Sequence, residues 1–320
     1  MMKAELVMSW QGETFIPVVV DKIQLSSERK GSPAKLTFSV VKDEKLSFQE
    51  GTAVRFKWND ENVFYGFVFE KKRDKEQIIT CTAYDQLRYL KNKDTYVYEN
   101  KTAGEVIQMI AKDFNLQTGD IDDTGYKIPS RVEDNQCLFD IIQNALDLTM
   151  QNSKEMYVLY DDFGKICLKS LEHMKADILI DETVAENFDY VSSIDENTYN
   201  KIKLVFDNEG TGKRDVYIEQ HGENMNKWGV LQYYDKLQKG ENGKEKAQSL
   251  LKLYNQRTRK LSIKNCLGVC GIRGGSLVLV SMNLGDLKVS NYFLVESCKH
   301  EFSLEEHFME LKVRGGEFVG

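Results

Sequence analysis

Proline is scarce in this chain, and cysteine and histidine are few. The 320 residues include 3 prolines, 6 cysteines and 4 histidines. With so few prolines, no stretch can form a proline-rich linker. The cysteines are widely scattered, unlike the dense spacing of a disulfide framework in a small secreted protein. We therefore expect reduced and mostly buried thiols.

Long hydrophobic runs are also missing. No window approaches the roughly 20 apolar residues that a membrane-spanning helix needs. The N-terminal stretch, residues 1–15, lacks the apolar core of a signal peptide. We expect a protein that is made in the cytoplasm and does not leave by the ordinary secretory route.

The chain has no excess of positive charge. Its 43 basic and 50 acidic residues give a formal net charge of −7. This balance argues against bulk attraction to nucleic acid or to an anionic membrane surface, and we expect neither as a partner. The local basic run Lys71–Arg73 is flanked by acidic residues, which is typical of a solvated hairpin tip.

Motifs of catalysis and of ion binding fail at defined positions. No GxSxG elbow or HExxH helix occurs. A calcium-type loop starting at Asp120 would need a carboxylate at its twelfth position, where Arg131 stands. Gly210–Lys213 resembles a phosphate loop, but Asp207 replaces a required glycine and the segment joins two strands, which indicates a hairpin turn. We expect no catalytic residue and no cofactor.

One group of side chains has the chemistry of a zinc site, namely Cys266, Cys270, Cys298, His300 and His307. The first two lie in a strand-like stretch, where residues four apart are about 13 Å apart, too far for one ion. The sequence favours buried thiols and structural histidines, with metal binding as the open alternative.

The pattern of elements is β, then α+β, then β, over a length that suggests roughly two domains of about 150 residues. Residues 1–95 contain several short strands without an intervening helix, such as Leu36–Val40, which is typical of a small antiparallel barrel or sandwich. Gly66 stands in mid-strand, where a bend or a close backbone contact is expected.

The sequence pattern of residues 96–185 predicts an α+β domain. Thr102–Glu105 forms a capping-box pattern before a helical run of apolar residues. A polar loop is expected over residues 117–133, followed by a second helix that opens at Asp134. Two paired strands are expected around residues 161–164.

Residues 186–320 return to β, with an inserted helix over residues 242–258. Paired strands are expected at 201–207 and 214–220. The last two strands, Tyr292–Phe302 and His307–Val313, alternate apolar and polar residues and predict a hairpin with its turn at Ser303–Glu305.

Four stretches together resemble the baseplate hub proteins of contractile phage tails. This is the late control protein D family, and in particular its XkdQ/YqbQ-like branch, found in phage tail-like particles and R-type bacteriocins. The stretches are residues 62–68 with 81–85, residues 101–116, residues 274–280, and the closing hairpin with His300 and His307. The resemblance spans most of the chain. The order of the four stretches along the chain is stronger evidence for the family than any single stretch.

The resemblance implies an α+β, mostly β fold in which two small antiparallel β-barrels, residues 1–95 and 186–320, flank an α+β domain at 96–185. It implies a structural subunit and not an enzyme. Three copies would form a ring that links the six-fold tail tube to the three-fold spike. The implied partners are further copies of the chain, the spike protein, the tail tube protein, other baseplate wedge proteins and a LysM-containing tail protein.

Two alternatives stay open, a tail-associated cell-wall hydrolase and a glycan-binding module. Some members of the family carry an additional hydrolase domain. This sequence ends at Gly320, directly after the last predicted strand, and we therefore expect no lytic activity.

Overall fold

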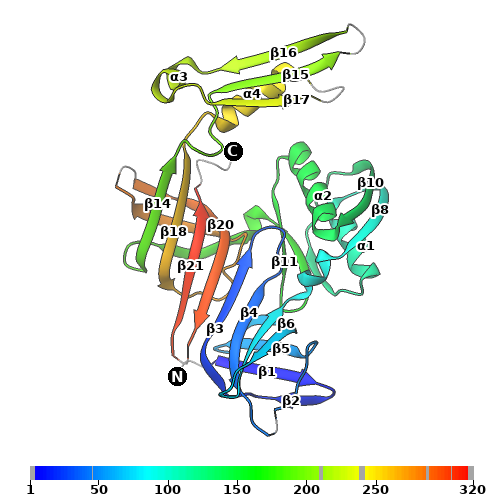
Figure 1. The fold of residues 1–320 in the computed structure, drawn as a ribbon, viewed down its shortest axis with the longest axis vertical. Helices are drawn as coiled ribbons and strands as arrows, with labels where there is room; N and C mark the ends of the chain where they lie inside the picture. The colour runs from blue at the N-terminus through cyan, green and yellow to red at the C-terminus, as the bar shows by residue number, and fades with distance from the viewer. Residues whose placement is uncertain are drawn as a thin grey trace. The chain divides into compact units, whose positions relative to one another are not determined.

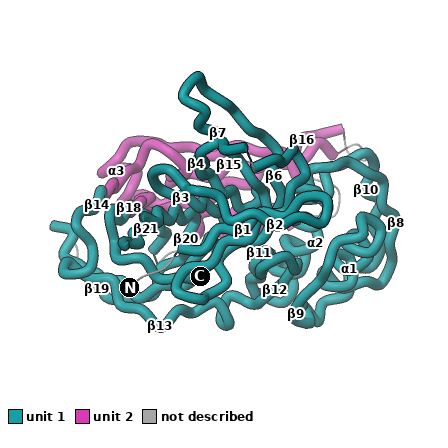
Figure 2. The backbone as a smooth tube through the Cα atoms, turned by 90° about the horizontal axis from the view of Figure 1, so that it is seen from below, with its two compact units in different colours: residues 1–189, 262–320 teal, residues 190–261 magenta. Residues whose placement is uncertain are grey.

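The computed structural model describes residues 4–44, 46–208, 212–237, 242–285, 288–303 and 305–315. Strands make up most of the ordered elements, and helices are concentrated in two places (Figure 1). The fold is therefore mostly β with an α+β part, as the sequence predicted. The chain divides into two compact units, unit 1 with residues 1–189 and 262–320, and unit 2 with residues 190–261 (Figure 2). None of the helices in these ranges is long and apolar enough to cross a bilayer.

The N-terminal part of unit 1 is an antiparallel sheet whose spatial order is β3-β4-β7-β6-β5-β1-β2. Its inward residues alternate along each strand, as Leu36, Phe38 and Val40 do, and they form one apolar core. The strands are β1 (Ala4–Trp10), β2 (Glu13–Phe15), β3 (Val19–Glu28), β4 (Lys35–Val41), β5 (Ala53–Trp58), β6 (Glu61–Arg73) and β7 (Ile78–Tyr84).

Gly66 marks a close backbone approach within this sheet. A Cβ atom at this position would lie far inside van der Waals contact with the backbone carbonyl of Tyr84 on β7. The pairing of β6 with β7 also shifts register between Val68 and Glu70. The mid-strand glycine therefore lets β6 bend against its neighbour, which confirms the contact predicted at this position.

The C-terminal strands of unit 1 continue the same sheet, because β20 pairs with β3. They are β13 (Lys175–Ile180), β19 (Leu277–Asn283), β20 (Lys288–Phe302) and β21 (His307–Arg314), with the parts of β14 (Ala185–Ser193) and β18 (Thr258–Leu267) that lie outside residues 190–261. Strand pairing among the described residues does not close into a barrel, so the arrangement of two barrels stays a prediction.

The closing hairpin is confirmed, since β20 and β21 pair from Leu294 with Arg314 to Phe302 with His307. A bulge between Val295 and Ser297 shifts the register, and before it both faces of β20 are covered, since Phe293, Leu294 and Val295 are all buried. The predicted strict alternation therefore holds only beyond the bulge. Of the predicted turn, Leu304 lies outside the described residues.

The α+β part of unit 1 packs two helices around one apolar core. Its elements are η1 (Gln86–Lys91), β8 (Lys93–Lys101), α1 (Ala103–Asp113), β9 (Thr118–Ile121), β10 (Ile128–Cys137), α2 (Leu138–Ser153), β11 (Tyr157–Asp161), β12 (Ile166–Ser170) and η2 (Leu171–Met174). The predicted capping box is confirmed, because Thr102 caps the amide of Glu105 and the Glu105 carboxylate accepts from the Thr102 amide.

The loop predicted over residues 117–133 and the helix start predicted at Asp134 are wrong. β9 and most of β10 occupy the loop, and α2 begins only at Leu138. β10 lacks an apolar alternation, since Val132 is exposed and Glu133 is buried, and its place is fixed by pairing with β8, for example Val132 with Val97. Such long-range pairing is not visible in a local pattern.

Unit 2 is a three-stranded sheet with one helix packed on it. Its elements are β15 (Lys201–Asn208), β16 (Lys213–Gln220), α3 (Gly222–Trp228), β17 (Gln232–Lys236) and α4 (Gly243–Tyr254). The strand pair and the helix are confirmed. α4 starts at its cap, Asn242, and ends four residues before the predicted end, because β18 begins at Thr258. The predicted turn at Gly210–Lys213 lies partly outside the described residues.

Candidate functional site

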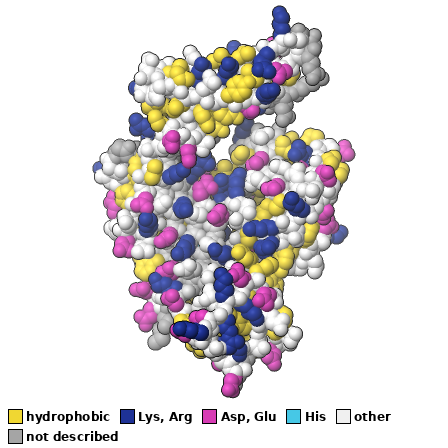
Figure 3. All heavy atoms as spheres, viewed as in Figure 1, with side chains coloured by type: hydrophobic (Ala, Val, Ile, Leu, Met, Phe, Trp, Pro, Cys, Tyr) yellow, Lys and Arg dark blue, Asp and Glu magenta, His cyan; other side chains and the backbone are white. Residues whose placement is uncertain are grey.

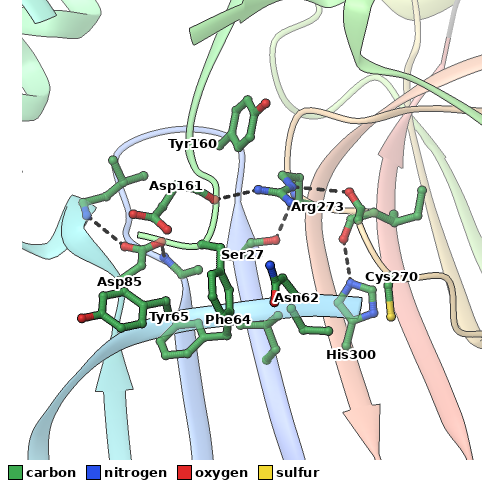
Figure 4. Close-up of a pocket in the computed structure, with 18 of the residues that line it drawn as sticks. Ser27, Asn62, Phe64, Tyr65, Asp85, Tyr160, Asp161, Cys270, Arg273 and His300 are labelled. Carbon is green, nitrogen blue, oxygen red and sulfur yellow. Dashed lines mark hydrogen bonds between the residues drawn. The ribbon is translucent and has the colours of Figure 1, made fainter. Parts of the chain in front are cut away.

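A small polar cavity in unit 1 collects charged side chains from segments that are distant in sequence (Figure 4). Its volume is about 60 Å³. Asp85 comes from the end of β7, Asp161 from the end of β11, and Arg273 from the loop between β18 and β19. His300 of β20 and Ser27 of β3 also line it. The cavity therefore lies where the N-terminal strands, the α+β part and the C-terminal strands of unit 1 meet.

Asp85 is a buried carboxylate that accepts hydrogen bonds from backbone amides. It caps η1 by accepting from the amide of Leu87 at 3.0 Å, and its other oxygen accepts from the amide of Ala34 at 2.9 Å. The side chain is only 3% exposed. Burial raises the pKa of this carboxyl well above its usual range, and the negative charge of Asp161 raises it further.

Asp161 has one carboxylate oxygen that accepts a hydrogen bond from the described residues and one that does not. Its Oδ1 accepts from the amide of Gly164 at 2.7 Å, whereas Oδ2 is buried without a hydrogen bond from any described residue. Burial is the largest effect on its carboxyl and raises the pKa to about 7, against the opposing effects of the Gly164 amide and of Arg273. Two such buried carboxyls close to each other favour retention of a proton at neutral pH.

Arg273 lies in this site without a direct ion pair to either buried carboxylate. Its Nη1 donates to the backbone carbonyl of Asp161 at 2.7 Å, and its guanidinium stacks on the ring of Tyr160, with Cζ 4.6 Å from the centroid. The next residue, Gly274, donates its amide to Ser27 Oγ at 3.0 Å. Arg273 and Gly274 therefore tie the loop to β11 and to β3.

His300 lines the cavity, but both of its ring nitrogens are occupied. Nε2 lies 2.7 Å from the carbonyl oxygen of Ile272, and Nδ1 lies 2.9 Å from Nε2 of His307. Burial lowers the pKa of His300 to about 4, and burial together with the charge of His300 lowers that of His307 to about 3. Both rings are therefore neutral at pH 7.

The five predicted zinc-type side chains are only partly brought together. Cys298 Sγ lies 3.1 Å from His300 Nε2, so Cys298, His300 and His307 are neighbours. Cys266 belongs to β18, but Cys270 follows the end of that strand, so the prediction of one strand-like stretch is wrong there. Burial raises the pKa of Cys266 to about 11 and that of Cys270 to about 12, so both are protonated thiols at neutral pH. Within the described residues, no three such side chains form a metal-binding group.

The carboxylates near Asp120 form hydrogen bonds with nearby residues of the chain. Asp122 accepts from the amide of Ser170 at 2.8 Å and lies 2.9 Å from His173 Nδ1. Asp123 accepts from the amide of Gly125 at 2.9 Å. These contacts satisfy the local backbone and match a turn better than a cation loop.

The cavity is suited to holding backbone segments together and is poorly suited to catalysis on a polymer. Ligand pockets commonly measure about 300–1,000 Å³, whereas this one has room for a few water molecules. Three of the four carboxylate oxygens of Asp85 and Asp161 bind backbone amides. Sequence reasoning missed this cluster, since nothing local links positions 85, 161 and 273; only Asp85 stood in a string that carried the resemblance.

Comparison with solved structures places the fold among phage tail proteins. The 43 kDa tail protein of prophage MuSo2 from Shewanella oneidensis superposes with a TM-score of 0.73, at 12% identity, over 99% of this chain and 100% of that one. The E. coli c3393 protein, a type VI secretion component described as similar to T4 tail proteins gp27 and gp5, gives a TM-score of 0.58 at 7% identity, over 98% and 78%.

The sequence assigns the chain to one family within this class of phage tail proteins. The chain belongs to the YqbQ-like family, whose model matches residues 23–314. The phage-like element PBSX protein XkdQ of Bacillus subtilis strain 168 is 29% identical over 310 residues, which is 93% of each chain. The resemblance inferred from the four sequence stretches is confirmed at the level of the family.

Proposed function

We propose that the chain is a structural subunit of the baseplate hub of a contractile tail, in a phage, a phage-like particle or a tail-like bacteriocin. The observation that carries the proposal is the family match over residues 23–314, together with a relative that is named as part of a phage-like element. The fold shared with a phage tail protein along the whole chain supports it.

In this proposal three copies form a ring that links the six-fold tube to the three-fold spike. The two β parts act as two barrel-like halves of each copy, at residues 1–95 and 186–320, flanking the α+β domain at 96–185. The ring contacts the spike, tube and wedge proteins and a LysM-containing tail protein. The type VI secretion component with the same fold supports this role, because its description relates it to tail proteins.

The small polar cavity with Asp85, Asp161 and Arg273 fits a rigid structural subunit. A ring subunit must keep its β parts in fixed register while its neighbours act on it, and partly buried hydrogen bonds from three segments support this constraint. The side chains of Asp85, Asp161 and Arg273 are used to hold backbone, which supports a structural role over hydrolysis.

Purified tail particles test the proposal. Their protein content should include this chain in a copy number of three for each baseplate, assembled inside the producing cell before release. Absence of the chain from intact particles would contradict the proposal. A peptidoglycan zymogram of the isolated chain addresses the hydrolase alternative: clearing of the gel would contradict a purely structural role.

A further inference from the structure

Unit 2 has two faces of different character. Alternation along the strands places the even-numbered residues of β15 and the odd-numbered residues of β16 and β17 on one side, where Ile202, Leu204, Tyr217 and Tyr233 pack with α4. The residues between them lie on the opposite side, which we call the open face. Val205 at the centre of this face is only 1% exposed, whereas the apolar residues around it are about half exposed.

The open face combines apolar and basic side chains. Val216, Ile218 and Tyr234 are each about half exposed, at 48%, 49% and 50%. Lys203 lies between two of them, because it pairs with Ile218 on one side and with Tyr234 on the other. On the face of unit 2 that is turned toward the viewer, Figure 3 shows hydrophobic and basic side chains interspersed, with few acidic ones among them.

The charges of the two faces are segregated. The open face carries Lys201, Lys203, Arg214 and Lys236, and along the described strands Asp207 is its one carboxylate. Asp207 is already engaged, since it accepts from Arg214 Nε at 2.6 Å and from Lys236 Nζ at 3.2 Å. The other strand carboxylates, Asp215, Glu219 and Asp235, lie on the α4 side. The open face therefore presents uncompensated positive charge around apolar residues.

The rest of the chain has the opposite charge. Unit 2 carries 13 basic and 10 acidic residues, a net charge of +3, whereas unit 1 carries 30 basic and 40 acidic residues, a net charge of −10. A basic patch with an apolar centre recognises an acidic surface by complementary potential, and the apolar residues supply the contact area. Unit 1 is the acidic part of the chain by its net charge, and a second copy offers it at equal stoichiometry.

We propose that the open face of β15, β16 and β17 docks onto the acidic unit 1 of a second copy of this chain. Lys201 and Lys203 select the acidic surface, while Val216, Ile218 and Tyr234 are buried by it. The proposal rests on the proposed ring, for which it names one of the contacts between copies.

Charge reversal tests this contact in the full-length chain. Lys201→Glu together with Lys203→Glu should weaken self-association at least about tenfold, measured by sedimentation equilibrium. The control, Lys244→Glu with Lys252→Glu, makes the same change of charge on exposed positions of α4 and should leave association unchanged. Circular dichroism checks that both variants fold. Raising the salt from about 50 to 500 mM should weaken the wild type and affect the open-face variant less.

A photo-crosslinking amino acid at position 234 identifies the surface that is bound. In an equal mixture of isotopically light and heavy chains, crosslinks between the two should join position 234 to residues 1–189 or 262–320. A wild-type chain that stays monomeric, or crosslinks made only to another tail protein or to nucleic acid in whole particles, would overturn the proposal. Trimers that persist after the open-face charge reversal would also overturn it, while leaving the hub function intact.

Discussion

Nδ1 of His300 lies 2.9 Å from Nε2 of His307, inside the hairpin that closes the chain. The carbonyl of Ile272 can only accept, so Nε2 of His300 must donate to it and Nδ1 must accept a hydrogen bond from the Nε2–H of His307. The hydrogen bonds thus fix one tautomer for each ring. The segment that is richest in histidine and cysteine uses these side chains to pair with each other and with a neighbouring loop.

Removing one ring should destabilise unit 1 strongly. His300→Ala leaves the Ile272 carbonyl and the His307 N–H buried without partners and opens a cavity, so we expect a loss of about 2–4 kcal/mol in the free energy of unfolding by urea. The same substitution at His173, whose side chain is 68% exposed, should cost less than about 1 kcal/mol. Equal losses at the two positions would contradict the buried network.

The histidine pair should also make the protein sensitive to acid. The folded-state pKa values of about 4 and about 3 lie below the unfolded value, so the stabilisation is present above pH 6.5 and is lost as the pH falls through 4. We expect wild type to lose about 2–3 kcal/mol relative to the double variant His300→Gln and His307→Gln between pH 7 and 4. Parallel pH profiles for the two proteins would contradict neutral histidines in the core.

Asp161 should show the opposite dependence on pH. Its folded-state pKa of about 7 is raised, so its contribution to stability is present below the unfolded pKa near 4 and is lost as the pH rises through 7. Asp161→Asn keeps an acceptor for the Gly164 amide and removes the charge. We expect it to stabilise the protein by about 1–2 kcal/mol at pH 8 and by much less at pH 5. Thermal melts at the two pH values measure this difference.

The matched control for that prediction is Asp162→Asn, because the Asp162 side chain is adjacent and 63% exposed. Exposed charges are screened, and the control should change stability by less than about 0.5 kcal/mol at either pH. A gain at pH 8 that is shared by both variants would show that the effect is general and does not come from the buried carboxyl.

Gly66 should tolerate no side chain. In Gly66→Ala the new Cβ would collide with the backbone carbonyl of Tyr84, which cannot move without breaking the pairing of β6 with β7. We expect a loss of more than about 3 kcal/mol, or an insoluble protein. Gly222→Ala at the start of α3 meets no neighbour and should be nearly neutral. A stable, soluble Gly66→Ala protein would contradict the register of these strands.

The sequence predicted those parts of the fold that depend on local patterns. The capping box at Thr102, the helix behind it and the closing hairpin are all found, because caps and alternation act within a few residues. β10 was missed because its polar residues resemble a loop, and its pairing with β8 is a contact over some thirty residues.

The candidate site could not be predicted from the sequence, because it also depends on contacts between residues that are distant in the sequence. Asp85, Asp161 and Arg273 carry no signal at their own positions, and only the folding of three segments onto one another brings them together. The histidines could be singled out by composition, but not their mutual hydrogen bond, since the bulge at Val295 sets which residues of β20 face inward. The absence of a catalytic or metal site in this chain stays a prediction.

A single-particle density map of the tail particle that contains this protein tests the central claim most directly. We predict three copies of the chain in a ring at the centre of the baseplate, between the end of the tube and the spike, with side-chain density for β20 and β21 that matches the pairing described above. A map in which the chain lies at the periphery, or in which a different protein joins the tube to the spike, would contradict the account.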